Sequence, residues 1–327
     1  MIRKQNYIDL NNSFTREVVF QMGTLAGFFS EYNSMIFSML YSLDHRIRFV
    51  LSTNNANFDK EKGWRGFFEP FCEERKTNKE EHYSTANWRF AVKSLLKGNW
   101  NARRSLYPYL KSSKQSLLTQ DVFGRARDPH TINKHYTITE IDICGDFTHA
   151  CGQLIALTWV FNAETKQSID EKISSVALPE QYISCQIRGG DKDSEFPLLS
   201  VEQYIKRIAQ QTDCKHIFIL TDDYAIFEQC KANYPQYIWY TLCEKNEKGY
   251  FHQQFKQGST FDMRMQYINL FASIEVFSRS EYFFGTLTSN PGAYMALRCP
   301  EIFVQVDEDT NSCIPLKYKE YNTTQRE

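Results

Sequence analysis

The stretch YISCQIRGGDK (residues 182–192) decides how the chain is read. Its first part, residues 182–187, follows Pro179 and is rich in β-forming side chains, so it predicts a buried strand. Arg188 and two glycines come directly after it. Because glycine lets a chain turn sharply and brings its backbone close to a ligand, the stretch predicts a strand that ends in a binding loop.

The rest of the second half repeats this alternation of strand and helix. A helix is predicted to begin at Ser200, a good N-cap with Gln203 three residues on, and His216 to Thr221 predicts the next strand. Further strands are predicted at 237–240, 282–285 and 302–306, with helices at 224–233 and 265–278. The alternation predicts a doubly wound, mainly parallel α/β sheet, in which ligands bind at the carboxyl ends of the strands.

The first half is less regular. Apolar residues spaced by three and four predict a helix over residues 27–41, a strand follows at 48–51, and a helical pattern runs from 88 to 118. Residues 120–136 show no period and predict a loop, which is either an acceptor-binding loop or an ordinary solvated one. That loop carries a basic cluster made of Arg125, Arg127, His130, Lys134 and His135.

Length and composition limit the function classes. The 327 residues suggest two domains, which we place at 1–150 and 151–327. Lys and Arg number 38 against 39 Asp and Glu, so no basic excess points to nucleic acid or to an anionic membrane. No stretch predicts a membrane span, and the nine cysteines lack a C-x-x-C pair, so we expect no zinc site, reduced core cysteines and a cytoplasmic location.

The loop after residue 187 also carries charges suited to chemistry. Arg188 offers a planar fork for a phosphate or diphosphate, Lys192 adds a point charge, and Glu195 is a carboxylate beside these cations. Such a set suits displacement of a diphosphate while the carboxylate deprotonates an acceptor hydroxyl. The alternative is a surface turn whose charges pair with one another.

Two more polar segments follow predicted strands. Asp222 and Asp223 can hydrogen-bond a base or sugar, hold a divalent metal, or cap the next helix, and we expect one of them to cap. The loop GTLTSNPG (residues 285–292) can direct hydroxyl and backbone N–H groups at a phosphate. The sequence has no zinc-protease, P-loop or nucleophile-elbow motif, which disfavours those enzyme classes.

These motifs, taken in order, resemble a known family. The run IRGGDK (residues 187–192), Glu195, Tyr204 and the run LTDD (residues 220–223) are similar to the donor-binding half of the core α1,6-fucosyltransferases and their nodulation and protein O-fucosyltransferase relatives. A fainter likeness begins at GFFSE (residues 27–31). Together the likeness covers about residues 20–75 and 150–300.

The resemblance implies a GT-B-like pair of Rossmann-type domains with a cleft between them. It implies an inverting, metal-independent glycosyltransferase without a cofactor, which transfers L-fucose from GDP-fucose to a hydroxyl of an oligosaccharide acceptor. Arg188 would grip the β-phosphate, and Lys192 and Glu195 would form the catalytic pair. The implied donor-binding residues are Gly27, Gln186, Arg188, Asp191, Tyr204, Asp222, Asp223, Ser289 and Asn290.

Three positions depart from the family pattern. Gly189 stands where a second arginine is usual, Gln186 where a histidine packs on guanine, and Ser273 where an aspartate reads the guanine amino group. The alignment of Glu195 also depends on a one-residue gap before Tyr204. Two alternatives therefore stay open: the same fold with another nucleotide sugar, or a non-catalytic glycan- or nucleotide-binding protein.

Overall fold

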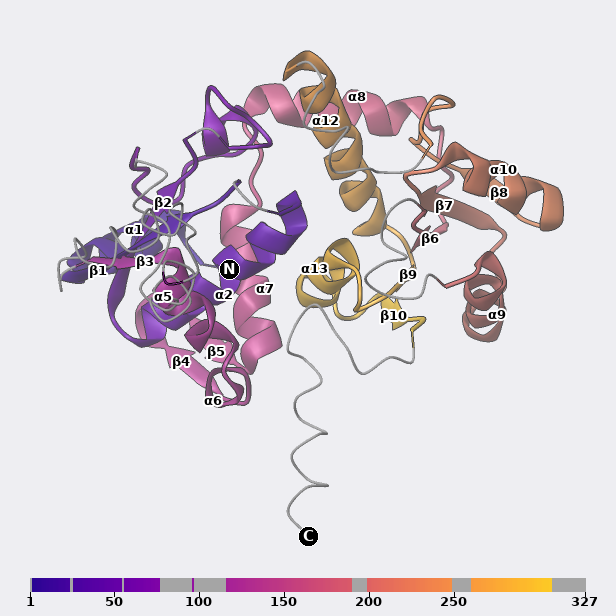
Figure 1. Ribbon diagram of the computed structural model, residues 1–327. Helices are drawn as coiled ribbons and strands as arrows, with labels where there is room; N and C mark the ends of the chain where they lie inside the picture. The colour runs from indigo at the N-terminus through magenta and orange to yellow at the C-terminus, as the bar shows by residue number, and fades with distance from the viewer. Residues whose placement is uncertain are drawn as a thin grey trace, which may run out of the picture. The chain divides into compact units, whose positions relative to one another are not determined.

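The computed structural model describes residues 2–23, 26–54, 56–76, 96, 116–189, 199–248 and 260–307. The chain divides into two compact units, of which the first reaches Asn162 and the second begins at Ala163. The expected boundary between residues 150 and 151 falls inside helix α7 (Phe147–Thr158), which belongs to the first unit. Both units are α/β (Figure 1).

The first unit is built on a parallel sheet with the strand order β2-β1-β3. Val18, Val19 and Phe20 of the central strand are buried, as is typical of a parallel strand covered on both faces. The strands are β1 (Arg16–Gln21), β2 (Ile47–Ser52) and β3 (Ser116–Leu118), with an antiparallel pair of β4 (Tyr136–Ile138) and β5 (Ile143–Gly145). The helices are α1 (Lys4–Ser13), α2 (Phe28–Asp44), α5 (Thr119–Phe123), α6 (Pro129–Ile132) and α7, with 3-10 turns η1 (Gly63–Gly66), η5 (Arg125–Arg127) and η6 (Thr139–Ile141).

Two predictions for this unit are wrong. The helical pattern expected up to residue 118, most of which lies outside the described residues, ends in strand β3, because Ser116 to Leu118 pair with the central strand. The segment 120–136 is not an irregular loop but holds α5, η5 and α6. These elements are too short to show a period in the sequence, and local caps fix them: Asp128 accepts the N–H of His130 at 2.9 Å.

Part of the basic cluster in that segment is used inside the unit. Lys134 pairs with Asp44. Arg127 donates to Ser34 Oγ at 2.6 Å, and its guanidinium lies 3.8 Å from the centre of the Phe123 ring. Burial lowers the pKa of Arg127 to about 10. Arg127 therefore packs helix α2 against η5.

Aromatic packing forms the core beside this sheet and accounts for much of the aromatic content of the sequence. The buried ring of Tyr32 lies 5.7 Å from that of Phe28 and 6.2 Å from that of Trp64, and Trp159 meets it edge-on at 5.4 Å. The Tyr32 hydroxyl is 2.7 Å from Thr158 Oγ1, so the polar tip of this buried ring is satisfied.

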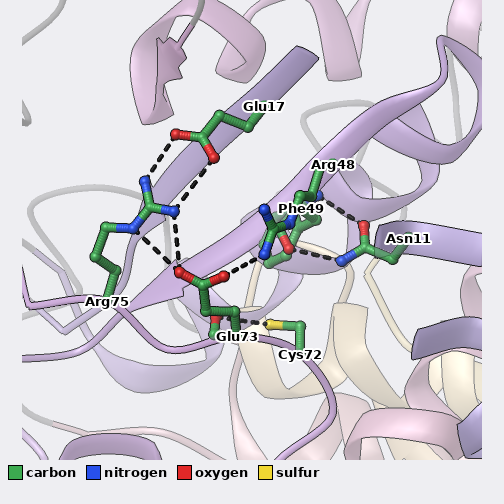
Figure 2. Close-up of polar contacts among 7 residues, drawn as sticks. All are labelled: Asn11, Glu17, Arg48, Phe49, Cys72, Glu73 and Arg75. Carbon is green, nitrogen blue, oxygen red and sulfur yellow. Dashed lines mark hydrogen bonds and ion pairs between the residues drawn. The ribbon is translucent and has the colours of Figure 1, made fainter. Parts of the chain in front are cut away.

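The outer edge of strand β2 is closed by other parts of the chain (Figure 2). The amide of Asn11 donates to the Phe49 carbonyl at 2.9 Å and accepts the Phe49 N–H at 2.7 Å. Two residues on, the N–H of Leu51 bonds to the Glu73 carbonyl at 2.9 Å, and the N–H of Arg75 to the Leu51 carbonyl at 2.8 Å. Every backbone group that these two strand residues turn outward thus has a partner.

The second unit confirms the predicted parallel sheet. Its strand order is β10-β9-β6-β7-β8, and every neighbouring pair is parallel. The strands are β6 (Ile183–Gln186), β7 (His216–Leu220), β8 (Ile238–Tyr240), β9 (Phe283–Gly285) and β10 (Phe303–Gln305). The helices are α8 (Ala163–Ser175), α9 (Val201–Gln211), α10 (Tyr224–Asn233), α12 (Thr260–Phe277) and α13 (Asn290–Arg298).

Local capping explains why helix α9 begins where the sequence predicts. Ser200 Oγ accepts the N–H of Gln203 at 3.4 Å, and the Gln203 side chain accepts the N–H of Ser200 at 2.8 Å. This reciprocal capping box satisfies two N–H groups at the helix start. Val201, Tyr204 and Ile208 then face the core, as their spacing indicates.

Within the described ranges, none of the helices combines the length and the apolar character that crossing a lipid bilayer requires. The prediction of core cysteines holds for Cys151, Cys185, Cys230 and Cys299, which are buried. It does not hold for Cys144, which is exposed, while Cys72, Cys214 and Cys243 are partly buried.

Candidate functional site

The candidate site lies at the carboxyl edge of the second sheet. Because all its strands are parallel, the segments that follow β6, β7, β9 and β10 leave the sheet at this one edge. They bring together Arg188 and Gly189 after β6, Asp222 and Asp223 after β7, Ser289 after β9 and Asp307 after β10.

Arg188 is held beside Asp222. Its Nη2 lies 3.6 Å from Asp222 Oδ2, and the two side chains are 21% and 20% exposed. The other carboxylate oxygen, Asp222 Oδ1, accepts the N–H of Gly189 at 2.7 Å. Among the described residues Asp222 is the ion-pair partner of Arg188, and a contact through one nitrogen leaves other N–H donors in the guanidinium plane able to bind an anion.

The second aspartate of the pair caps a helix. Asp223 accepts the N–H of Ala225 at 2.9 Å at the start of α10, and its own N–H bonds to Thr221 Oγ1 at 3.2 Å. This confirms the prediction that one of the two aspartates would serve as an N-cap.

Gly189 is packed closely against the same helix. A Cβ atom at this position would lie 3.2 Å from both Asp223 Cβ and Ile226 Cδ1, which is tighter than an ordinary carbon contact. A side chain at residue 189 would therefore have to push against α10. The position cannot readily supply a second cation to this edge.

Ser289 connects the loop after β9 to the end of β6. It is the N-cap of α13, since its Oγ accepts the N–H of Gly292 at 3.1 Å. The same hydroxyl donates to Gln186 Oε1 at 2.8 Å, and both side chains are buried. Asn290, the next predicted donor-binding residue, opens helix α13 and is half-buried.

Asp307 belongs to this edge, although the sequence analysis missed it. It follows β10, is 7% exposed, and accepts the N–H of Leu287 and of Thr288, each at 3.1 Å. The available signal was an acid directly after a predicted strand, the same signal that singled out Asp222.

Tyr204 and Ser273 lie below the edge rather than on it. Tyr204 is 3% exposed and packs in the core of the second unit. Burial raises the pKa of Tyr204 well above the ordinary tyrosine value, so the hydroxyl stays protonated. Ser273 is buried in α12, where its hydroxyl donates to the Asn269 carbonyl at 2.8 Å.

Gly27, the predicted contribution of the first unit, is the N-cap of α2 and has open space where a Cβ would stand. The Glu31 carboxylate accepts the N–H groups of Gly23 and, at 2.7 Å, of Ala26. The open space at Gly27 lets a ligand approach its backbone closely.

The remaining predicted residues, Asp191, Lys192 and Glu195, lie outside the described residues. Across the described part of the chain, no group of His, Cys, Asp and Glu side chains is arranged to hold a metal ion.

Comparison with solved structures identifies the fold. A structure of NodZ α-1,6-fucosyltransferase soaked with GDP-fucose matches at a TM-score of 0.52 and 13% identity, over 87% of this chain and 93% of that chain. Fucosyltransferase NodZ from Bradyrhizobium matches at a TM-score of 0.53 and 13% identity, over 89% and 95% of the two chains. No protein-family model and no curated protein matches the sequence. The predicted resemblance is therefore confirmed for the fold, which is similar to that of a fucosyltransferase.

Proposed function

We propose that this chain is a glycosyltransferase that moves L-fucose from GDP-fucose to a hydroxyl of an oligosaccharide acceptor, with inversion and without a metal. The observation that carries the proposal is the position of Arg188. It stands at the carboxyl edge of a parallel sheet, two residues after Gln186, which bonds to Ser289, in a chain whose fold is similar to that of NodZ. A planar cation next to a helix N-terminus is suited to a diphosphate.

In the proposed reaction, the acceptor oxygen attacks the anomeric carbon of fucose while the bond from that carbon to the β-phosphate oxygen breaks. GDP leaves, and Arg188 stabilises the charge that develops on it. Glu195 takes the proton of the acceptor hydroxyl, or polarises that hydroxyl through Lys192. Asn290 and Ser289 bind the diphosphate, Asp191, Asp222, Asp223 and Tyr204 line the nucleotide and sugar site or support it, and Gly27 lends a backbone N–H.

Nucleotide binding is the first test. Calorimetric titration of GDP, UDP, CMP and GDP-fucose without metal should show selective binding of the guanine nucleotides, and Arg188→Ala should abolish it. Arg279→Ala is a matched control, because Arg279 is a half-exposed arginine of the same unit that contacts Asp170 at 4.0 Å. Preference for UDP or CMP would overturn the assignment of GDP-fucose as the donor. If no nucleotide binds, the proposal that the chain is a glycosyltransferase is overturned.

Transfer itself is the second test, and it separates an enzyme from a binding protein. Glu195→Gln and Lys192→Ala should abolish fucosyl transfer to an oligosaccharide mixture while GDP binding stays within about threefold of the unmodified chain. A chain that binds GDP-fucose but never releases GDP in the presence of acceptors would be a binding protein.

One observation favours a different nucleotide sugar as the second candidate. Gly189 offers no side chain to a diphosphate, a side chain there would have to displace Asp223 and Ile226 slightly, and Gln186 is held by Ser289. Two positions expected to contact a GDP-fucose donor are therefore used in another way. The panel of nucleotides in the first test decides between the two donors.

A further inference from the structure

Asp307 is a buried acid placed beside an expected anion site, and this requires an explanation. A carboxylate near a diphosphate repels it, and a buried carboxylate is costly unless it is hydrogen-bonded. Asp307 is 7% exposed and accepts two consecutive backbone N–H groups, those of Leu287 and Thr288. The carboxylate thus holds backbone rather than ligand.

We propose that Asp307 is a positioning residue of the donor site, which fixes the loop of residues 286–289 so that Ser289, Thr288 and Asn290 meet the diphosphate in one geometry. That the ligand is a diphosphate rests on the proposed function. The role of Asp307 in ordering the loop does not depend on which ligand binds.

The position of Asp307 is itself fixed by the sheet. The residue before it, Val306, donates its N–H to the Gly285 carbonyl at 2.9 Å, which continues the pairing of β10 with β9. The Asp307 carbonyl accepts Gln305 Nε2 at 2.8 Å. The carboxylate therefore reaches the loop from a rigid strand end, which is a suitable support for a binding site.

Two elements hold the loop. Asp307, which follows β10, accepts the N–H groups of Leu287 and Thr288, and Gln186 of β6 accepts the hydroxyl of Ser289. Thr286 and Leu287 are buried, whereas Thr288 and Asn290 are half-buried and form the accessible part of the segment. Asp307 is the one member of this support that contributes a negative charge.

The beginning of helix α13 leaves little freedom to the loop. The Thr286 carbonyl oxygen lies 3.2 Å from Ser289 Oγ, and a Cβ at Gly292 would lie 2.1 Å from that carbonyl oxygen. Any shift of Leu287 and Thr288 must therefore move Ser289 or the first turn of α13. Loss of the Asp307 bonds should for this reason be felt where the diphosphate binds.

Replacing the charged Asp307 with a neutral residue should change GDP affinity in opposite directions, depending on whether Asp307 acts through its charge or positions the loop. If only the charge of Asp307 mattered, Asp307→Asn would remove a repulsion and GDP would bind more tightly. If Asp307 positions the loop, the amide loses one bond and turns its NH2 group toward a backbone N–H, so GDP should bind about tenfold more weakly, the factor of one lost hydrogen bond. Asp307→Ala should weaken binding further.

The decisive experiment measures GDP affinity by calorimetry on the full chain, together with amide hydrogen exchange. Glu275→Gln is the matched control, since it weakens the partly buried ion pair of Glu275 with Arg298, 2.7 Å apart, in the same unit. We expect weaker GDP binding in both Asp307 variants and unchanged binding in the control. Unchanged or tighter GDP binding in Asp307→Asn would overturn the proposal.

Hydrogen exchange separates failure of this proposal from failure of the proposed function. Exchange of the Leu287 and Thr288 amide protons should quicken about tenfold or more in Asp307→Asn without nucleotide, while the amides of helix α9 keep their rates. If the unmodified chain binds no GDP, the donor assignment fails, and these rates still decide the role of Asp307. Equal rates in variant and unmodified chain would refute it.

Discussion

The carboxylate of Asp222 accepts the N–H of Gly189 at 2.7 Å, which ties the segment leaving β6 to the segment leaving β7. Asp307 does the same between the neighbouring segments, with the N–H of Leu287. In both pairs an acid at the end of one parallel strand satisfies a backbone N–H at the end of the next. Asp222 therefore holds the segment that follows β6, and Asp307 holds the segment that follows β9.

Replacement of Asp222 should weaken anion binding by disordering this edge. Asp222→Ala removes the bond to Gly189 and the ion pair with Arg188, so we expect GDP affinity to fall by roughly tenfold to a hundredfold, the factor of about 1–3 kcal/mol for a buried group left unsatisfied. Asp222→Asn keeps an oxygen for the Gly189 N–H, so its GDP affinity should lie between that of Asp222→Ala and that of the unmodified chain. Calorimetric titration with GDP measures both.

The Asn variant also shows which contact of Asp222 matters. If Asp222→Asn binds GDP as the unmodified chain does, the N–H bond to Gly189 is the important contact and the 3.6 Å ion pair is secondary. If Asp222→Ala binds GDP normally, neither contact positions Arg188.

Ser289→Ala should lower stability and GDP affinity together. The variant removes the cap of α13 and leaves Gln186 Oε1 without its donor in a buried place. We expect a loss of about 1–2 kcal/mol in the free energy of unfolding, the usual cost of losing a serine cap. Urea unfolding measures the loss, and Ser200→Ala, which removes the cap of α9, is a matched control that should cost similar stability without the loss of affinity.

Sequence was sufficient for the fold of the second unit because its signals are local. The capping box of Ser200 and Gln203 lies within four residues, and the apolar strands alternate with helices of ordinary length. Strand β3 was missed because three residues show no period and their pairing with β1 involves positions about a hundred residues away. Such a strand is defined only by its partner.

The residues at the candidate site could also be predicted from local sequence signals. Arg188, Asp222 and Ser289 follow predicted strands, and the parallel order of the sheet brings them to one edge. The bonds between them were not predictable, because Asp307 meets Leu287 only through the pairing of β10 with β9. Helical spacing, by contrast, placed Tyr204 on the buried side of α9, and the structure has this side chain in the core of the second unit.

Glu247 should make stability depend on pH. Burial, with the nearby charges of Glu244 and Asp222, raises the pKa of Glu247 above its ordinary value, so the folded chain holds this proton more tightly than the unfolded chain does. The stability it contributes is complete below the unfolded pKa, about 4.3, and is lost as pH rises through the raised folded pKa. Glu247→Gln keeps an oxygen for the Glu244 N–H and removes this loss.

We therefore expect Glu247→Gln to be more stable than the unmodified chain at pH 7 and equal to it near pH 4. Urea unfolding at several pH values measures the difference. Glu228→Gln, which alters an exposed glutamate of α10 that pairs with Lys231, is the control and should show no such trend. A stability difference that shrinks as pH rises would contradict the assignment.

Asn11 should be a major contributor to the stability of the first unit, because its amide takes the place of a neighbouring strand for Phe49 (Figure 2). Asn11 is 1% exposed and Phe49 is fully buried, so no water can easily replace the amide. Asn11→Ala leaves one N–H and one C=O unpaired, and at about 1–3 kcal/mol for each we expect a loss of about 2–6 kcal/mol in the free energy of unfolding.

Urea unfolding of Asn11→Ala, Asn11→Asp and Ser13→Ala separates the bonds of Asn11 from the propensity of helix α1. Ser13 lies on the same helix and its exposed hydroxyl donates to the Leu10 carbonyl, so Ser13→Ala should change stability by less than about 0.5 kcal/mol. Asn11→Asp can still accept the Phe49 N–H but sets a charged oxygen against the Phe49 carbonyl, so it should be at least as destabilising as alanine at pH 7 and recover on acidification. If Asn11→Ala is as stable as Ser13→Ala, the edge of β2 is satisfied without Asn11, and the amide does not act as a substitute strand.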